Sequence, residues 1–247
     1  MHPALTRQHH RPWTIPGREW VWRQSWCDLL FAHWRCPADR LRHLVPEELE
    51  IEEFDGSSWV GVVPFRMEGV MRRPLPDLPW ISAFPELNFR LYVRYEDRPG
   101  VWFVSLDATN RLAIWAARRF FHLPYFHSRI ALSFEEGWHV YDSRRLNGDA
   151  RFIARYRPEA ALATSLPGTL EYFLTERYCL YSQSPRGDLY RAEVHHHPWP
   201  LQRALAEIEV NELGDSHGIS LNGPPETLHF SGRLDTIVWQ PYRLAQP

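Results

Sequence analysis

The stretch from Phe84 to His127 constrains the fold of this chain more than any other part of the sequence. It begins with FPELNFRLYVRY, in which the side chains from Glu86 to Tyr95 alternate strictly between two faces, as along a strand whose two faces differ. The turn-forming run Asp-Arg-Pro-Gly at 97–100 separates it from a second strand-like run, GVWFVSLDAT. The run NRLAIWAARRFFHL then has helical periodicity and stops at Pro124. The stretch therefore predicts a β-hairpin followed by a helix.

The polar face of the first predicted strand carries Glu86, Asn88 and Arg90. Such a row is commonly the solvated side of an antiparallel sheet. The expected neighbouring strands, 59–65 and 101–106, are apolar on both faces, so a sheet built from them would be covered on both sides. Buried Glu and Arg must be paired or functional. The row is therefore either a solvated face or part of a site, and the sequence leaves both interpretations open.

Composition limits the class of protein. The 247 residues suit one large domain or two small ones, and the net charge of −2 gives no electrostatic reason to expect nucleic acid. No apolar run is long enough for a membrane span, and the N-terminal segment MHPALTRQHHRPW lacks the apolar region of a signal peptide. Three cysteines without CxxC spacing fit reduced thiols. We therefore expect a cytoplasmic protein without nucleic-acid or membrane partners.

The chain contains no lysine, so all 28 of its Lys and Arg residues are arginine. A coding bias explains this absence without any reference to function. Its chemical consequence holds in either case, because no side-chain amine is present to form a Schiff base.

Residues 1–18 are expected to form a loose arm, and residues 19–247 a single domain, because no repeat or long linker divides the chain. A hairpin is expected around the turn Asp55-Gly56, and a loop at 72–79. The run 201–212 fits a strand or a helix, with strand favoured at its end. Many short antiparallel strands with two or three helices predict a curled or closed sheet. Strands are expected at 20–34, 49–54, 58–70, 126–134, 139–145, 151–157, 179–183, 189–196 and 229–242, and helices at 37–44 and 168–177.

Five stretches carry a resemblance to a known family: LLFAHWRCPADRLRHLVPEELEIEEFDGSSWVGVVPFRM, SAFPELNFRLYVRY, GVWFVSLDATNRLAIWAARRFFHLPYFHSR, GTLEYFLTERYCLYS and VHHHPWPLQ. Together, over residues 20–243, they resemble the YqjF-like family of uncharacterised bacterial proteins, in the acetoacetate decarboxylase-like superfamily. The resemblance implies a mainly β fold of the α+β class. It also implies a curved antiparallel sheet that closes into a barrel, with a few packed helices outside and a polar pocket inside.

The sequence departs from the decarboxylases at one position. In those enzymes the Schiff-base lysine follows a proline just after the arginine-bearing helix. The similar run here is RRFFHLPY, and Tyr125 stands where the lysine would be. The resemblance therefore does not transfer the decarboxylase mechanism. It also implies an acidic residue on the strand before the helix, for which Glu86 is the counterpart by order and context.

The run around Pro124 supplies further candidates. Tyr125 and His127 share a side if a strand begins at Tyr125, and they could then donate a hydrogen bond and move a proton. A lone histidine such as His127 is more often a structural residue than a catalytic one. Arg118 and Arg119 are adjacent, so at most one is expected to face a pocket, where it would favour a carboxylate or phosphate. The alternative is a structural ion pair with Glu86 or Asp107.

The C-terminal half supplies the remaining candidates. In GTLEYFLTERYCLY, either Glu171 or Arg177 could reach the pocket, or the helix could carry only caps and salt bridges. His196, on the apolar face of its strand, is a pocket candidate. His195 and His197 share the other face with a carboxylate and suit zinc in principle, but no further spaced ligand follows. No metal is expected, and no cofactor motif is present.

Three functional hypotheses remain. In the first, the protein binds a small, anionic or oxygenated organic ligand in a barrel pocket without covalent chemistry. In the second, it is a lyase, hydratase or hydrolase that acts on a small carboxylate or oxo-acid by non-covalent acid–base catalysis. In the third, it has no pocket and its aromatic residues serve packing alone. The sequence is also compatible with a homo-oligomer, and it does not decide whether the protein is an enzyme.

One site prediction is specific. Glu86 and Arg90 leave the same face of one strand about 13 Å apart, with Asn88 between them. We expect them to face one cavity, together with Tyr125 and either Arg118 or Arg119.

Overall fold

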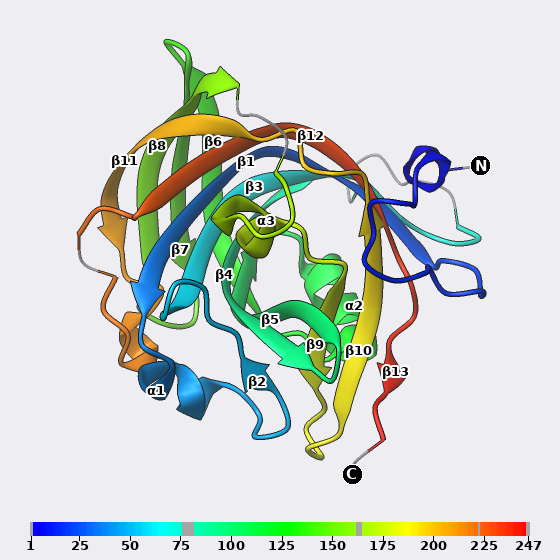
Figure 1. The fold of residues 1–247 in the computed structure, drawn as a ribbon. Coiled ribbons are helices and arrows are strands. Elements are labelled where there is room, and N and C mark those ends of the chain that lie inside the picture. The colour runs from blue at the N-terminus through cyan, green and yellow to red at the C-terminus, as the bar shows by residue number, and fades with distance from the viewer. Residues whose placement is uncertain (1, 76–81, 162–164, 222, 246–247) are drawn as a thin grey trace.

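The computed structural model describes residues 2–75, 82–161, 165–221 and 223–245. Within them, one large sheet of 13 strands is accompanied by a few short helices (Figure 1). The helices are α1 (Ala38–Leu41), α2 (Arg111–Phe121) and α3 (Leu170–Thr175). The strands are β1 (Trp22–Cys36), β2 (Glu50–Ile51), β3 (Ser58–Arg72), β4 (Phe84–Tyr95), β5 (Arg98–Ala108), β6 (Tyr125–Glu135), β7 (Trp138–Arg145), β8 (Arg151–Ala161), β9 (Cys179–Gln183), β10 (Leu189–His196), β11 (Gln202–Asn211), β12 (Thr227–Val238) and β13 (Tyr242–Arg243).

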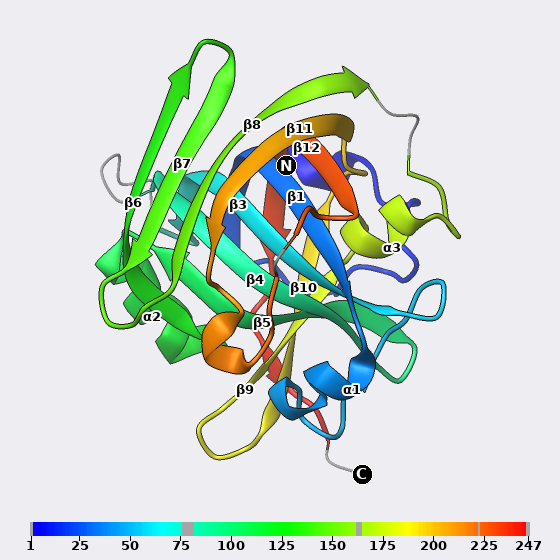
Figure 2. The ribbon, with the colours of Figure 1, turned by 90° about the vertical axis from the view of Figure 1, so that its left-hand side faces the viewer.

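The sheet is strongly curved. Its strand order is β13-β10-β9-β5-β6-β7-β8-β11-β12-β1-β3-β4-β2, and the additional pairings β4–β5 and β10–β12 join strands that stand apart in this order. Figure 1 shows the long strands arching around a central space, and Figure 2 shows α2 and α3 at opposite sides of the molecule. The space between these two helices is where the cavity described below lies.

The expectation of a purely antiparallel sheet was wrong in two places. β5 pairs in parallel with both β6 and β9, while the other strand pairs are antiparallel in the part of the chain described. The reason for the β5–β6 pairing is the connection through α2, because a helical crossover can return the chain to run parallel to the strand it left. This parallel pairing also places Tyr125, the first residue of β6, beside Leu106.

The hairpin expected around Asp55-Gly56 forms only an isolated bridge between Phe54 and Ser57. β2 pairs with β4 instead of β3. The cause is that β3 already has β1 and β4 on its two edges, so β2 can add only to the free edge of β4. The β4–β5 hairpin, by contrast, forms as predicted.

The N-terminal segment is not a loose arm. Its 3-10 helix, Pro3–Thr6, packs against β10 and β12, and Ala4 is buried. Arg11 forms an ion pair with the buried Glu193, and the indole N–H of Trp13 donates to the same carboxylate at 2.8 Å. A buried carboxylate requires such partners, which is why the segment is held in place.

Two apolar cores lie on opposite faces of the β4–β5 hairpin. Leu87, Phe89 and Leu91 belong to one core, as the alternation predicted. The other core lies beneath α2 and includes Ile114 and Phe121 of that helix. The Glu86 face of β4 is turned toward this second core.

The predicted helices are present. Asn110 caps α2, because its Oδ1 accepts from the backbone N–H groups of Leu112 and Ala113. α1 continues into a short 3-10 turn, as the run 37–44 predicted. Part of the loop expected at 72–79 lies outside the described residues. Among the described residues, no helix has the length and apolar content needed to cross a membrane.

Candidate functional site

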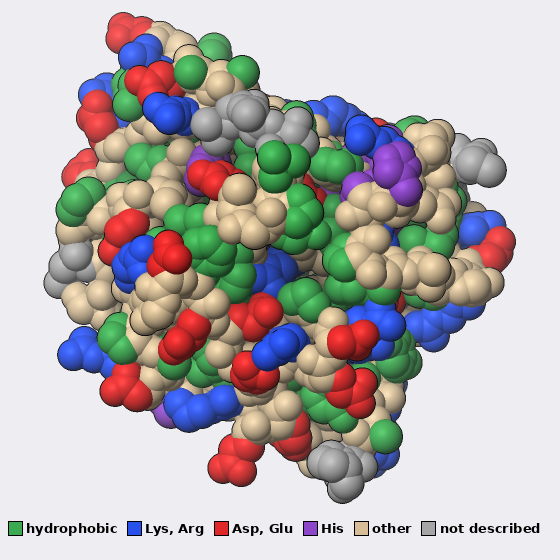
Figure 3. Space-filling model, viewed as in Figure 1, with side chains coloured by type: hydrophobic (Ala, Val, Ile, Leu, Met, Phe, Trp, Pro, Cys, Tyr) green, Lys and Arg blue, Asp and Glu red, His purple; other side chains and the backbone are tan. Residues whose placement is uncertain are grey.

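A cavity of about 160 Å³ lies between the β4–β5 hairpin, α2 and the segment that follows α3. An engineered apolar cavity of about 150 Å³ binds benzene, so a space of this size can hold a small organic molecule. Figure 3 shows a hollow near the centre of one face, where basic and hydrophobic side chains meet. The cavity wall is largely apolar, and its aromatic part consists of Trp22, Trp26, Phe65, Phe84, Phe103, Phe121, Tyr125 and Trp199.

The polar row of β4 lines this cavity. Glu86, Asn88 and Arg90 are only 1%, 7% and 9% exposed. The interpretation of the row as a solvated face does not hold, because α2 and the segment after α3 cover that side of the sheet. Each of the three side chains therefore needs a partner in the protein or in a ligand.

Tyr125 meets Glu86 at the end of the cavity near α2. The Tyr125 hydroxyl donates a hydrogen bond of 2.8 Å to Oε2 of Glu86. The position of Tyr125 is set by the start of β6, where the backbone N–H of Leu106 donates to the carbonyl of Pro124 at 3.1 Å. The structure thus brings together two side chains that the sequence placed in one site.

Burial controls the protonation of this pair. Desolvation raises the pKa of Glu86 to about 8, the hydrogen bond from Tyr125 opposes that rise, and the charge of Asp107 adds to it. Burial also raises the pKa of Tyr125 well above its ordinary value. At neutral pH the Glu86 carboxyl is therefore largely protonated, and it can donate a proton or a hydrogen bond.

Arg90 lies at the other end of the row, near α3. Its Nε donates to the hydroxyl of Tyr92 at 3.1 Å, and its Nη2 donates to the carbonyl of Leu174 at 3.0 Å. The guanidinium carbon also lies 5.3 Å from the ring centre of Phe31. No carboxylate among the described residues forms an ion pair with Arg90. Because arginine stays protonated in proteins, this buried cation can attract an anion.

Asn88 separates the acidic and basic ends of the row. Its Oδ1 is buried and has no hydrogen-bond partner among the described residues. A buried amide without a partner costs about 1–3 kcal/mol, which a ligand hydrogen bond would recover. Asn88 therefore gives the cavity a third polar contact.

Arg177 and His196 also line the cavity, as the sequence suggested for both. Arg177 forms an ion pair with Glu52, so its charge is already compensated. Burial lowers the pKa of His196 to about 4, which leaves its imidazole neutral at pH 7. Its two ring nitrogens lie 2.7 Å and 3.3 Å from the carbonyl oxygens of His197 and Arg177, and the single N–H of the neutral ring donates to one of them. Both side chains therefore have partners within the protein.

Neither arginine at the end of α2 lines the cavity. Arg118 donates through Nε to the backbone carbonyl of Tyr125 at 2.8 Å, and Arg119 lies near the ring of Phe120. The expectation that one of them faces the site was therefore wrong. The cause is the orientation of α2. Its alanine-rich face, which includes Ala117, is turned toward the cavity, and the two arginines therefore project from other faces of the helix.

His127 and Glu171 also lie away from the cavity wall. His127 follows Tyr125 by two residues, but β6 has left the cavity by then, and its backbone carbonyl accepts from the N–H of Leu146. Glu171 has one carboxylate oxygen 3.9 Å from His229 and is partly exposed. Glu171 therefore lies on the outer surface of α3. Of the two candidates in this part of the sequence, Glu171 and Arg177, it is Arg177 that lines the cavity.

The residues that hold Arg90, and most of the aromatic wall, were not predicted from the sequence. His33 on β1 and Tyr92 on β4 are buried side by side, 2.5 Å apart between Nε2 and the hydroxyl oxygen. Trp26 and Trp199 stack at a centroid distance of 5.5 Å. No local pattern predicted these contacts, because the residues that make them lie far apart in the sequence.

Asp107 forms a buried ion pair with Arg145. The two side chains make hydrogen bonds of 2.9 and 2.7 Å, and Ser128 donates to Asp107 at 2.6 Å. The guanidinium of Arg145 also lies 3.7 Å from the ring centre of Phe126. The negative charge of Asp107 is thus compensated by Arg145, and its carboxylate is not available to a ligand.

The histidines of β10 do not gather into a metal site. Nε2 of His195 lies 2.8 Å from the carbonyl oxygen of Ala4 in the N-terminal segment. In the described part of the chain, no group of three or more His, Cys, Asp or Glu side chains is arranged to hold a metal ion.

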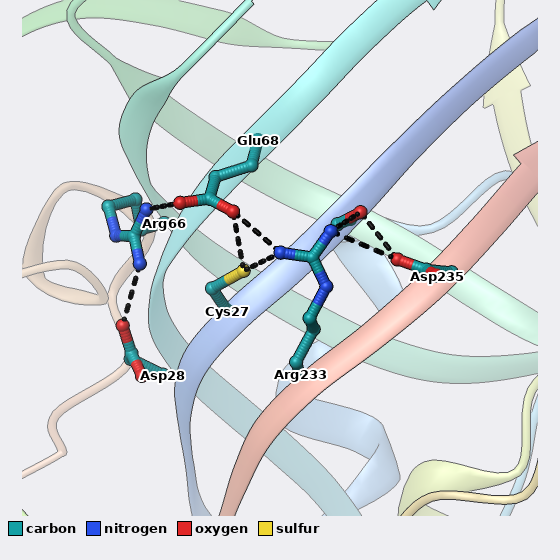
Figure 4. A network of polar contacts seen from close by, with 7 residues as sticks. Cys27, Asp28, Arg66, Glu68, Arg233 and Asp235 are labelled. Atoms are coloured by element: carbon teal, nitrogen blue, oxygen red, sulfur yellow. Dashed lines mark hydrogen bonds and ion pairs between the residues drawn. The ribbon is translucent and has the colours of Figure 1, made fainter.

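A separate polar network joins β1, β3 and β12 away from the cavity (Figure 4). Glu68 accepts from Arg233 at 2.7 Å and also pairs with Arg66, and the thiol of Cys27 lies 3.6 Å from Glu68. Burial raises the pKa of Cys27 to about 11, so the thiol is protonated and unreactive at neutral pH. Its neighbour Trp26 lines the cavity, so this network lies on the opposite face of β1.

Comparison with known sequences identifies close relatives. Residues 23–235 match the DUF2071 family, described as an uncharacterized conserved protein. The uncharacterized protein YqjF of Bacillus subtilis (strain 168) is 44% identical over 227 residues, which cover 92% of this chain and 93% of that protein. The family resemblance inferred from the sequence is thus confirmed.

Comparison with solved structures identifies the same fold. An acetoacetate decarboxylase from Legionella pneumophila has a TM-score of 0.64 and 14% identity, over 94% of this chain and 93% of that one. An acetoacetate decarboxylase-like enzyme from Sphingomonas wittichii RW1 has a TM-score of 0.63 and 13% identity, over 96% and 99%. The enduracididine biosynthesis enzyme MppR, complexed with pyruvate, has a TM-score of 0.63 and 14% identity, over 95% and 92%. At these identities the likeness shows the fold alone.

Proposed function

This chain belongs to the DUF2071 family of uncharacterized conserved proteins, and we propose that it binds a small organic carboxylate in the cavity between α2 and α3. The carboxylate contacts Arg90, the uncharged part of the ligand fills the aromatic space, and Glu86 meets an oxygen of the ligand. Binding involves no Schiff base, because the chain has no lysine. In this proposal the curved strands form a barrel around the ligand.

The observation that carries the proposal is that Arg90 is buried without a carboxylate partner. It is a buried cation in a largely apolar cavity, and no carboxylate of the described chain pairs with it. Burying a charge without a partner is costly, so a bound anion would remove a cost that the free protein carries. The complex of MppR with pyruvate adds support, because there a protein of this fold holds a small carboxylate.

A second candidate function is non-covalent acid–base catalysis on such a ligand. The observation that favours it is the Glu86–Tyr125 pair, in which a carboxyl with a pKa of about 8 lies within the ligand cavity. A group with this pKa can exchange a proton near neutral pH. Glu86 would give or take the proton, and Tyr125 would hold the carboxyl in position.

As parts of the same proposal, the protein is cytoplasmic and its partner is a small molecule. The described cysteines, Cys27, Cys36 and Cys179, are buried and unpaired, which supports a reducing cytoplasm. The net charge of −2 supports a small-molecule ligand rather than nucleic acid or an anionic membrane.

Ligand-dependent thermal shift tests the proposal. Benzoate, pyruvate and hexanoate are added to the wild-type protein and to Arg90→Met, which keeps the bulk of the side chain but removes the charge. The matched control is Arg94→Met, on the same strand, whose ion pair with Glu50 is exposed. We expect at least one acid to raise the melting temperature of the wild type and of Arg94→Met but not of Arg90→Met. An equal rise in all three proteins would show that Arg90 does not bind the acid.

A further inference from the structure

We propose that His33 and Tyr92 are positioning residues that orient Arg90 toward a planar monocarboxylate, with an apolar body about the size of a benzene ring. This inference rests on the proposed function, because it assumes that Arg90 is the anion contact. His33 comes from β1 and Tyr92 from β4, and neither side chain lines the cavity. Both act on the ligand only through Arg90.

Chemistry fixes one hydrogen-bond direction in this group, and the direction of the second bond is part of the proposal. Arg90 Nε can only donate, so at 3.1 Å the hydroxyl oxygen of Tyr92 accepts. The hydroxyl proton of Tyr92 is then directed to Nε2 of His33, 2.5 Å away. This arrangement requires an unprotonated Nε2, so in the proposal the neutral ring of His33 carries its proton on Nδ1. A chain of donors thus runs from Arg90 through Tyr92 to His33.

Close packing holds these hydrogen-bonded side chains in place. His33 is 0% exposed and Tyr92 is 1% exposed. The ring of His33 stacks on Phe31 with centroids 6.3 Å apart, and Phe31 also contacts the Arg90 guanidinium. Gly61 of β3 completes the enclosure, because a Cβ there would lie 3.1 Å from the His33 ring and 3.2 Å from the Tyr92 hydroxyl. The guanidinium is thus held on one side by groups that cannot easily move.

The remaining hydrogens of Arg90 define the anion that it can hold. Nε and one hydrogen of Nη2 are used by Tyr92 and Leu174, whereas Nη1 donates to no described residue. The free edge formed by Nη1 and Nη2 matches the two oxygens of a planar carboxylate. Arg177, the other lining arginine, is already paired with Glu52, so the site offers one uncompensated positive charge. A monoanion fits this balance better than a phosphate dianion.

The size and surface of the cavity define the rest of the ligand. About 160 Å³ accommodates a body of benzene size, and the stacked indoles of Trp26 and Trp199 offer an aromatic wall. Benzoate is therefore the probe of choice. Benzyl alcohol is its neutral counterpart, because it has the same ring and no negative charge.

The test measures the affinity for both probes by isothermal titration in the wild type, Tyr92→Phe, His33→Leu, His33→Gln and Arg90→Met. We expect the wild type to prefer benzoate. Tyr92→Phe and His33→Leu should weaken benzoate binding about tenfold and leave benzyl alcohol binding unchanged, because one hydrogen bond to a charged group is lost or misdirected. His33→Gln should restore most of the preference, since its amide oxygen can accept from Tyr92.

The outcomes separate the two proposals. If Arg90→Met abolishes the benzoate preference but Tyr92→Phe and His33→Leu retain it fully, the positioning role is overturned and the proposed function stands. If the wild type shows no preference, or Arg90→Met keeps it, the carboxylate proposal itself fails and this inference fails with it. Unchanged benzyl alcohol binding shows that a variant has kept its fold and cavity, so a loss confined to benzoate supports positioning. An equal loss of both probes in Tyr92→Phe and His33→Leu, without recovery in His33→Gln, would overturn it.

Discussion

The hydroxyl of Tyr125 donates to Glu86 Oε2 at 2.8 Å, and 39 residues of chain separate the two. The β4–β5 hairpin, α2 and the first residue of β6 together create this contact. A carboxyl that is fully enclosed, with one phenol as its described side-chain partner, is easier to protonate than one in water. The pair is therefore a source of pH dependence in the stability of the fold.

The first prediction concerns Glu86→Gln. The pKa of Glu86 is about 8 in the folded protein and near its ordinary value of 4.5 when unfolded. Between these values the folded state holds a proton on Glu86 that the unfolded state has lost, so the contribution of Glu86 to stability falls as pH rises from 5 to 8. The contribution approaches about 5 kcal/mol across the full window. Urea unfolding at several pH values should show the stability of Glu86→Gln rising relative to that of the wild type between pH 5 and pH 8.

The control for this measurement is Glu50→Gln, since Glu50 is exposed and pairs with Arg94 at the surface. Its unfolding curve should follow the pH dependence of the wild type. Parallel curves for the wild type and Glu86→Gln would show that Glu86 does not carry the raised pKa.

Local patterns in the sequence predicted much of the fold, because the alternation of side chains along a strand decides which of them can be buried together. Strict alternation in β4 placed Leu87 and Phe89 in one core and the Glu86 row on the other face. The apolar neighbours on both sides favoured burial of this row without deciding it, and the structure shows the row buried. The same reasoning could not identify α2 as the cover, since that depends on how the crossover returns the chain.

Other parts of the site depend on long-range contacts that leave no periodic signal. The sequence narrowed the choice to Arg118 or Arg119, but neither faces the cavity, because the small residues of α2 allow closer approach to the sheet. The His33–Tyr92 contact joins residues 59 positions apart on strands that are not neighbours in the sequence. Arg11 appeared to belong to a loose arm because its partner, Glu193, is 182 positions away.

The second prediction concerns that N-terminal contact. The side chains of Arg11 and Glu193 are 0% and 5% exposed, and they form an ion pair. Arg11→Met leaves the buried Glu193 carboxylate with Trp13 and Arg191 as its partners. We expect a loss of about 3 kcal/mol in the free energy of unfolding, measured in urea at pH 7.

The control is Arg7→Met, because Arg7 is exposed in the same segment. It should change stability by less than about 0.5 kcal/mol. If both variants are equally stable, the N-terminal segment contributes nothing to the fold and the packing described above does not persist in solution.

The last prediction concerns the buried ion pair between Asp107 and Arg145, whose side chains are 2% and 5% exposed. Arg145→Met leaves the carboxylate of Asp107 buried with only the hydroxyl of Ser128 as a described side-chain donor, and should destabilise the protein by about 3–5 kcal/mol. Asp107→Asn removes the charge as well, so the double variant should be more stable than Arg145→Met alone. The exposed pair of Arg155 and Glu207 is the contrast, since its loss should cost less than about 1 kcal/mol. Urea unfolding of the four proteins measures the coupling energy, and additive losses at Asp107 and Arg145 would contradict a buried, interacting pair.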